Sequence, residues 1–83
     1  MNDIDSLNRI ESKEYIEEKL IAAGTSTNIF NDNALETIIS CARGIPRMIN
    51  RYCDKCLLIA NIRELNVIDS DLVLDVTNEV ELG

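Results

Sequence analysis

The turn Gly44-Ile45-Pro46-Arg47 combines residue types that suit both chain reversal and anion binding. Gly44 can adopt the left-handed conformation that ends a helix. Pro46 has the fixed φ angle and the missing N–H that suit the first position of the next helix. Arg47 then stands at the second position, beside the positive end of the helix dipole, where an acid would stabilise the helix by about 0.3–1 kcal/mol. Chain geometry explains Gly44 and Pro46 but not Arg47, which is therefore the candidate functional residue.

A guanidinium next to unpaired backbone N–H groups is suited to bind an anion, phosphate above all. Arg51 follows one helical turn later on the same side of the expected helix. Arg51 has a simple alternative interpretation as a solvated neighbour of Asp54 or Lys55. The role of Arg51 therefore stays open, and Arg47 is the stronger candidate.

The chain contains three cysteines, Cys41, Cys53 and Cys56, and no histidine. Cys53 and Cys56 form a C-x-x-C motif, but a structural zinc site usually has four ligands. A redox motif of the thioredoxin type is expected near a βαβ unit, and the local pattern does not predict the strand that would precede it. The odd number fits reduced thiols better than a disulfide framework. We expect the cysteines to be small core residues and no metal to be bound.

Length and composition predict one small helical domain. The 83 residues are 46% hydrophobic but only 4% aromatic, with no Trp, so Leu, Ile, Val and Ala must build the core. Such a core suits helix packing better than a sheet. No apolar run reaches the length of a membrane span and no signal pattern opens the chain, so we expect a cytoplasmic location and no membrane partner.

Charge is distributed unevenly along the chain. The net charge is −7, which argues against long-range attraction to nucleic acids or anionic membranes. Between Arg43 and Arg63, however, five basic residues face one acid, and beyond Arg63 there are six acids and no base. The positive charge therefore surrounds the candidate turn and the helix after it.

Four stretches show apolar residues at helical spacing. The first helix is expected to begin after an N-cap at Ser12 and to end at Gly24. The second is expected to begin after Asn31 and to end at Gly44. Together with two further helices these predict an all-α, compact four-helix bundle over residues 12–83, preceded by a flexible segment over residues 1–11.

The third helix is expected from Pro46 to about Ile62, and the fourth after a cap at Asp69. The third has a wide apolar arc, which predicts a central helix contacted on more than one side. The expected core residues of the last three helices are Leu35, Ile38, Ile39, Ala42, Ile49, Tyr52, Cys53, Cys56, Leu57, Ala60, Leu72, Val73, Val76 and Val80.

Three runs of sequence resemble the helical lid of AAA+ ATPases: Tyr15-Ile-Glu-Glu-Lys-Leu20, Ile29-Phe-Asn-Asp-Asn-Ala-Leu35 and Ala42-Arg-Gly-Ile-Pro-Arg-Met-Ile-Asn50. The most similar subgroup is that of secretion-pathway and transposition-type ATPases, related to the origin-recognition family. Its pattern is a Tyr-Ile helix, a Phe-x-x-x-Ala-Leu helix start and an Arg/Gly-x-Pro-Arg turn. The resemblance covers about residues 10–80 and implies the compact helical fold of such a lid.

The resemblance also implies roles for the turn. Arg47 corresponds to the sensor 2 residue, which reaches from the lid to the γ-phosphate of ATP held by a preceding P-loop domain. Ile45 and Pro46 are implied to lie near the adenine and ribose, with Gly44 at the same corner. The implied partners are the chain's own N-terminal P-loop domain and the neighbouring ATPase subunits.

The sequence also departs from a complete ATPase. It contains no G-x-x-x-x-G-K-[ST], no acidic strand end for Mg²⁺ and no sensor 1 region. We therefore expect this chain not to be an enzyme and to bind no cofactor alone, whereas the larger protein would bind ATP and Mg²⁺. The expected function is that of a sensor 2 lid domain, contributing to nucleotide sensing and subunit contact.

A small DNA-binding module is the first alternative, because two helices joined by a short Gly-containing turn resemble a helix-turn-helix. The third helix offers Arg47, Asn50, Arg51 and Lys55 for base or phosphate contacts. The acidic net charge argues against this reading, so we do not expect nucleic acid to bind the domain directly.

Two further alternatives come from other classes. Acyl carrier proteins are acidic four-helix domains of similar size with a modified Ser in Asp-Ser-Leu at their second helix; here Ser6 lies at the extreme start and Ser70 too near the end. A protein-interaction bundle overlaps with the lid reading, because lids also contact neighbouring subunits. Sequence alone does not separate the lid from a protein-interaction bundle.

Overall fold

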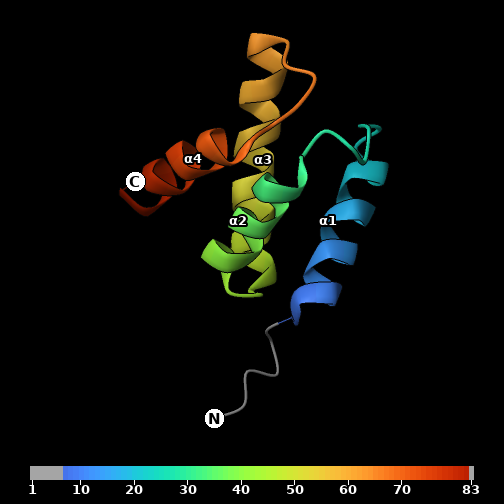
Figure 1. The fold of residues 1–83 in the computed structure, drawn as a ribbon, viewed down its shortest axis with the longest axis vertical. Coiled ribbons are helices and arrows are strands. Elements are labelled where there is room, and N and C mark those ends of the chain that lie inside the picture. The colour runs from blue at the N-terminus through green and yellow to red at the C-terminus, as the bar shows by residue number, and fades with distance from the viewer. Residues whose placement is uncertain (1–6, 83) are drawn as a thin grey trace.

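The computed structural model describes residues 7–82, with side chains as far as Val80, and contains four helices in that range. In chain order these are α1 (Arg9–Ala22), α2 (Asp32–Ala42), α3 (Pro46–Arg63) and α4 (Ser70–Leu82). Figure 1 shows α1 and α4 on opposite sides of α3, with α2 packed across it. The all-α, four-helix prediction is confirmed.

The longest helix, α3, is the centre of the bundle. It packs against α1, α2 and α4, and α2 in turn packs against α1 and α4. This arrangement confirms that the wide apolar arc of α3 is contacted on several sides. The consequence for the candidate turn is that the α3 backbone after Pro46 is held in place by three neighbouring helices.

The core follows the helical periodicity of the sequence. Every expected core residue of α2, α3 and α4 is buried except Leu57 and Val80, which are half-buried and pack against the core. Tyr52 is the largest of the fully buried side chains and has an exposed fraction of 1%. Ile16 and Leu20 of α1, Phe30 and Ile68 complete the apolar interior.

Three of the expected helix caps are confirmed. Gly24 follows the C-cap of α1 with φ +71°. The Asn31 side chain accepts a hydrogen bond of 2.8 Å from the Ala34 N–H at the start of α2. The Asp69 carboxylate accepts one of 3.0 Å from the Leu72 N–H at the start of α4.

The predicted start of the first helix is wrong. α1 begins at Arg9 with Asn8 as its N-cap, and Asn8 and Glu11 form a reciprocal capping box. Ser12 lies inside the helix and is fully buried. The capping box satisfies two backbone N–H groups that would otherwise be unpaired, whereas a cap at Ser12 would leave Arg9, Ile10 and Glu11 outside the helix. The division into a flexible segment over residues 1–11 and a domain over residues 12–83 stays a prediction, and residues 1–6 lie outside the described residues.

A short parallel bridge joins the two loops that lead into α2 and α4. The Asn31 N–H donates to the Ile68 carbonyl at 3.1 Å, and the Ile68 N–H donates to the Ile29 carbonyl at 2.6 Å. Sequence analysis did not predict this pairing. It fixes the starts of α2 and α4 next to each other, which orients both helices against α3.

The cysteines lie in or against the core, as expected for small core residues. Cys53 and Cys56 are fully buried in α3, and Cys41 is half-buried against the core. All three are free thiols. Burial raises the pKa of both Cys53 and Cys56 from 9.0 to about 12, so both stay protonated at neutral pH. Within the described residues, no helix is long and apolar enough to cross a membrane.

Candidate functional site

The corner between α2 and α3 is built from two successive left-handed residues. Arg43 has φ +55° and Gly44 has φ +74°. Arg43 therefore shares with Gly44 the helix-ending role that the sequence assigned to the glycine alone. The Arg43 N–H donates to the Ile39 carbonyl and the Ile45 N–H to the Ala42 carbonyl, both at 3.0 Å, so the corner is closed by backbone hydrogen bonds.

The residue Leu7 packs directly on this corner. The Leu7 N–H donates a hydrogen bond of 2.6 Å to the Gly44 carbonyl. Gly44 is buried, and a Cβ atom added to it would overlap the Leu7 carbonyl oxygen and lie 3.0 Å from the Leu7 nitrogen. Gly44 is thus required both by its positive φ angle and by the close approach of Leu7.

The α3 N-terminus that follows the corner has no side-chain cap. Ile45 occupies the N-cap position and its side chain cannot accept a hydrogen bond. The Ile45 carbonyl accepts from the N–H groups of Met48 and Ile49, each at 3.0 Å. The Arg47 N–H makes no such bond within the described residues. A positive helix end with an unoccupied donor attracts an anion.

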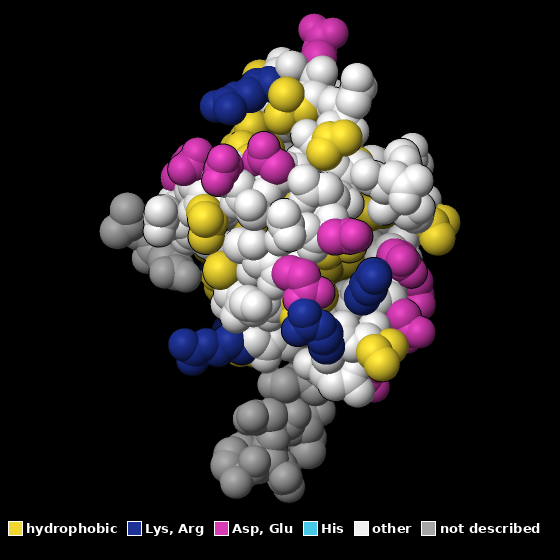
Figure 2. All heavy atoms as spheres, in the orientation of Figure 1, with side chains coloured by type: hydrophobic (Ala, Val, Ile, Leu, Met, Phe, Trp, Pro, Cys, Tyr) yellow, Lys and Arg dark blue, Asp and Glu magenta, His cyan; other side chains and the backbone are white. Residues whose placement is uncertain are grey.

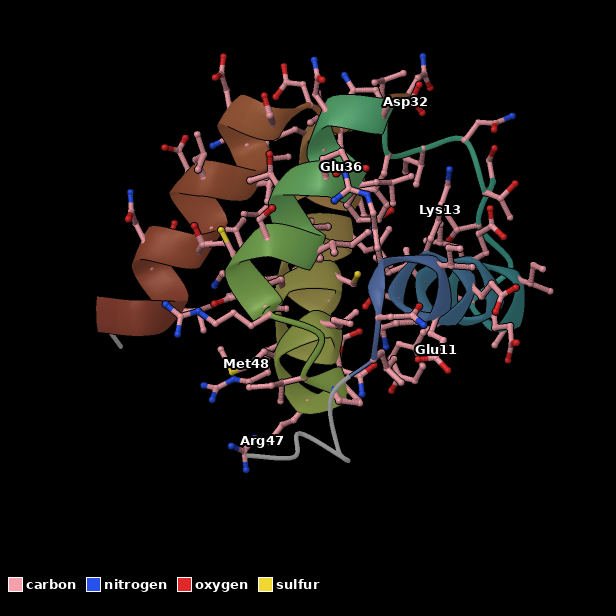
Figure 3. All side chains as sticks on the ribbon, turned by 60° about the horizontal axis from the view of Figure 1, so that its bottom comes forward. Glu11, Lys13, Asp32, Glu36, Arg47 and Met48 are labelled. Atoms are coloured by element: carbon pink, nitrogen blue, oxygen red, sulfur yellow. The ribbon has the colours of Figure 1, made fainter. Side chains whose placement is uncertain are left out.

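Arg47 stands on this helix end as the sequence predicted. It is the second residue of α3 and is exposed, and Figure 3 shows its side chain extending away from the body of the domain. Within the described residues, neither Arg43, Arg47 nor Arg51 forms an ion pair, while Arg9 pairs with Glu36. Among residues 7–80, the three arginines at and after the corner therefore have no carboxylate partner.

The other predicted site residues form the scaffold under Arg47. Gly44 is buried, Pro46 is half-buried as the first residue of α3, and Ile45 keeps 38% of its surface exposed. The structure thus brings all four residues together on one corner. Ile45 is the member of the four that adds exposed apolar surface next to Arg47.

Figure 2 shows acidic and basic side chains interspersed on one face of the domain, with basic side chains at its upper left and in its lower half. Hydrophobic side chains appear on this face as small separate patches. An acidic domain with a few unpaired arginines at one end can orient toward a localised anion without attracting polyanions in general.

Two polar residues of the third helix are engaged inside the domain. Asn50 donates a hydrogen bond of 2.8 Å from Nδ2 to the hydroxyl oxygen of Tyr15 in α1. Lys55 pairs with Glu79 of α4 at 3.7 Å. Both were candidate base or phosphate contacts in the helix-turn-helix alternative. The bond to Tyr15 argues against that use for Asn50, whereas the exposed pair of Lys55 is weak and does not decide it.

A groove of about 620 Å³ lies near the opposite end of α3. Its lining includes the apolar residues Ile29, Leu57 and Leu65 and the polar residues Asn61 and Glu64. Glu64 is the titratable residue of this lining, so the groove lacks the paired acids and bases that catalysis would need. The uncapped helix end and the exposed Arg47 lie at the corner instead.

The contact of Leu7 with Gly44 was not predicted, because residues 1–11 were expected to form a flexible segment. The signal that would have found Leu7 is the capping box Asn8-x-x-Glu11, which marks a helix start at Arg9 and fixes the residue before it. The contact between Leu7 and Gly44 spans 37 positions of sequence, and no local pattern predicts it.

The comparisons with known proteins give one partial relative. Over 49 residues, which are 59% of this chain, the sequence is 41% identical to General secretion pathway protein A of Aeromonas hydrophila. The match covers 9% of that protein's length. No family model matches the chain, and no solved structure matches it. The chain is therefore similar, over part of its length, to a small part of a protein named for a secretion pathway.

Proposed function

We propose that this chain is the lid of a larger AAA+ ATPase of the secretion-pathway type, and that Arg47 contacts the γ-phosphate of ATP held by a preceding P-loop domain. The similarity to General secretion pathway protein A supports the family coarsely. The helical fold fits a lid, and the described residues contain no strand element on which a P-loop could be built.

The single observation that carries the proposal is the placement of Arg47. An exposed guanidinium stands at an uncapped, positive helix end, on a backbone held by the Gly44 turn and by Pro46. Without an anion this placement disfavours the helix, because a cation lies beside the positive end of the dipole. A phosphate oxygen from outside the domain would neutralise both the guanidinium and the free Arg47 N–H.

The proposed mechanism is a change of angle between lid and core. With ATP bound, Arg47 would bridge the lid to the terminal phosphate; with ADP that contact would be lost. A ligand that binds the closed arrangement more tightly than the open one shifts the population toward it. ATP and Mg²⁺ would be held mainly by the P-loop domain, and the lid would also face neighbouring subunits.

The test is made in the longer protein that contains this chain. Arg47→Ala should lower the rate of ATP hydrolysis by about 10- to 150-fold, which corresponds to losing one charge-assisted contact of about 1.5–3 kcal/mol. Arg63→Ala is the matched control, because Arg63 is an exposed arginine at the other end of the same helix. Both variants should keep the helical circular dichroism of the lid. Turnover of Arg47→Ala equal to that of Arg63→Ala would rule out the sensor role.

A further inference from the structure

The contact between Leu7 and Gly44 joins the backbone just before α1 to the corner that carries Arg47. The bond from the Leu7 N–H to the Gly44 carbonyl measures 2.6 Å, and the Leu7 carbonyl oxygen lies against the Gly44 Cα, where no side chain would fit. This packing covers Gly44 and leaves it buried, although Arg43 and Ile45 on either side are exposed.

The backbone from Gly44 to Arg47 has little freedom to move independently. Gly44 and Arg43 hold left-handed φ angles, Pro46 fixes its own φ, and Ile45 is bonded to Ala42 on one side and to Met48 on the other. A shift at the Gly44 carbonyl is therefore carried to the first turn of α3 rather than absorbed by the loop.

On the other side of the contact, Leu7 is equally constrained. It directly precedes Asn8, whose side chain and backbone are both engaged in the capping box with Glu11. The backbone at Leu7 is thus fixed from its C-terminal side by α1, and its N–H is fixed by Gly44. A displacement of the backbone at Leu7 therefore acts directly on the hydrogen bond between the Leu7 N–H and the Gly44 carbonyl.

We infer that Leu7 and Gly44 are positioning residues for Arg47: the chain leading into α1 holds the α2–α3 corner in the conformation that presents the guanidinium. A change in the path of the chain before α1 then alters the presentation of Arg47, and a ligand that fixes Arg47 stabilises the Leu7 contact in return. The coupling between Leu7 and the corner does not require a nucleotide. A role of this coupling in nucleotide sensing rests on the proposed function.

Amide hydrogen exchange and ¹⁵N chemical shifts of the 83-residue chain test the coupling. Gly44→Ala should accelerate exchange of the Leu7 amide by about tenfold, because the added Cβ displaces the Leu7 carbonyl. Gly24→Ala is the matched control: Gly24 has φ +71°, close to the +74° of Gly44, but nothing lies within 4 Å of its added Cβ. It should carry the same backbone strain and leave the Leu7 amide unchanged.

A second variant tests the opposite direction and leaves the residues of the corner itself, 43–47, unchanged. Leu7→Pro removes the N–H that Gly44 accepts, so the amide signals of Arg47 and Met48 should shift while those of α4 stay in place. This variant leaves the fully buried core residues unchanged, although it removes the half-buried Leu7 side chain, and it reports even if Gly44→Ala does not fold. Arg47 and Met48 signals that do not move in Leu7→Pro, or a Leu7 amide that exchanges equally fast in both Gly variants, would overturn the inference.

These measurements separate the inference from the proposed function. The coupling is measured in the domain alone, and the sensor role of Arg47 is measured by ATP turnover in the longer protein. An unaffected turnover in Arg47→Ala together with shifted Arg47 signals in Leu7→Pro would remove the sensor role and leave the coupling in place.

Discussion

The side-chain amide of Asn50 donates a hydrogen bond of 2.8 Å to the hydroxyl oxygen of Tyr15, and this bond ties α1 to the first half of α3. Both residues belong to runs that resemble the AAA+ lid, yet neither was expected to contact the other. Asn50 is three residues beyond Arg47. The bond therefore helps to hold the helix end on which Arg47 stands, and it does so from the same helix, α1, that follows Leu7.

Tyr15→Phe should lower the free energy of unfolding by about 1 kcal/mol, because it removes the hydroxyl acceptor and leaves the half-buried Asn50 amide without this partner. Urea unfolding followed by circular dichroism measures the change. A double-mutant cycle with Asn50→Ala isolates the pair. If the two single changes simply add, the hydrogen bond contributes nothing to stability in solution.

Ser12 is a buried hydroxyl without a hydrogen-bond partner in the described structure. Because an unpaired buried hydroxyl destabilises a fold, Ser12→Ala should raise the free energy of unfolding by about 1 kcal/mol. Helix propensity alone would also favour Ala. The matched control is Ser40→Ala, an exposed serine inside α2 that gains the same propensity without the burial effect.

The difference between the two serine variants is the quantity to measure in urea unfolding. A larger gain for Ser12→Ala than for Ser40→Ala supports an unsatisfied hydroxyl. An equal gain, or a loss at Ser12, would mean that the hydroxyl finds a partner in solution, such as a buried water.

Much of the fold follows from local patterns in the sequence. The apolar stripe of α2 and the caps at Asn31 and Asp69 are short-range signals, and their physical causes lie within one or two helical turns. The turn at Gly44 and Pro46 is local in the same sense. These features were predictable because residues close in sequence decide them.

The features that the sequence did not reveal depend on residues far apart. The Phe30–Ile68 bridge, the Tyr15–Asn50 bond and the Leu7–Gly44 contact each join segments that only tertiary packing brings together. The start of α1 is a different case. Asn8 and Ser12 are both suitable caps, and the choice between them depends on burial of the Ser12 position against the other helices.

The candidate site likewise combines features that neighbouring residues decide with features that tertiary packing decides. The position of Arg47 at the second residue of α3 follows from Gly44 and Pro46, so sequence predicted it. The absence of an ion pair to Arg47 among residues 7–80 did not follow from the sequence. Asp54 of α3 and Glu79 of α4 pair with Lys19 and Lys55, and these pairings depend on how the helices pack.

The two buried thiols make stability depend on alkaline pH. The pKa values of Cys53 and Cys56 are raised by burial from 9.0 to about 12. Below the unfolded value both states hold the protons, so the full stability is present; above it the unfolded thiols ionise first, and stability is lost as pH rises toward the folded value. Urea unfolding from about pH 8 to about pH 11 should show this decline.

Because Lys and Tyr side chains also titrate in this range, the control is a Cys53→Ala, Cys56→Ala double variant. Its stability should fall less steeply above about pH 9 than that of the natural sequence. Parallel slopes would contradict the raised pKa values. In the same folded protein, alkylation followed by mass spectrometry should modify the half-buried Cys41 before either buried thiol.

Arg47 is expected to lower the free energy of unfolding of the isolated domain, because it places a cation at the positive end of α3. Arg47→Glu replaces a cation by an anion at the second position of α3, so interaction with the helix dipole should raise the free energy of unfolding by about 0.5–1 kcal/mol. Added negative charge also increases self-repulsion in a chain of net charge −7. Arg51→Glu shares that repulsion but lies one turn further from the helix end, where the dipole effect has faded, so it is the matched control.

The comparison connects stability with function. If Arg47→Glu is more stable than Arg51→Glu in urea unfolding, the natural arginine is held at a position where the fold alone would favour an acid. A residue that opposes local stability is expected where an external ligand supplies the missing interaction, here an anion at the end of α3. If the two variants are equally stable, Arg47 does not oppose the helix dipole, and only the geometry of the corner then supports an anion partner.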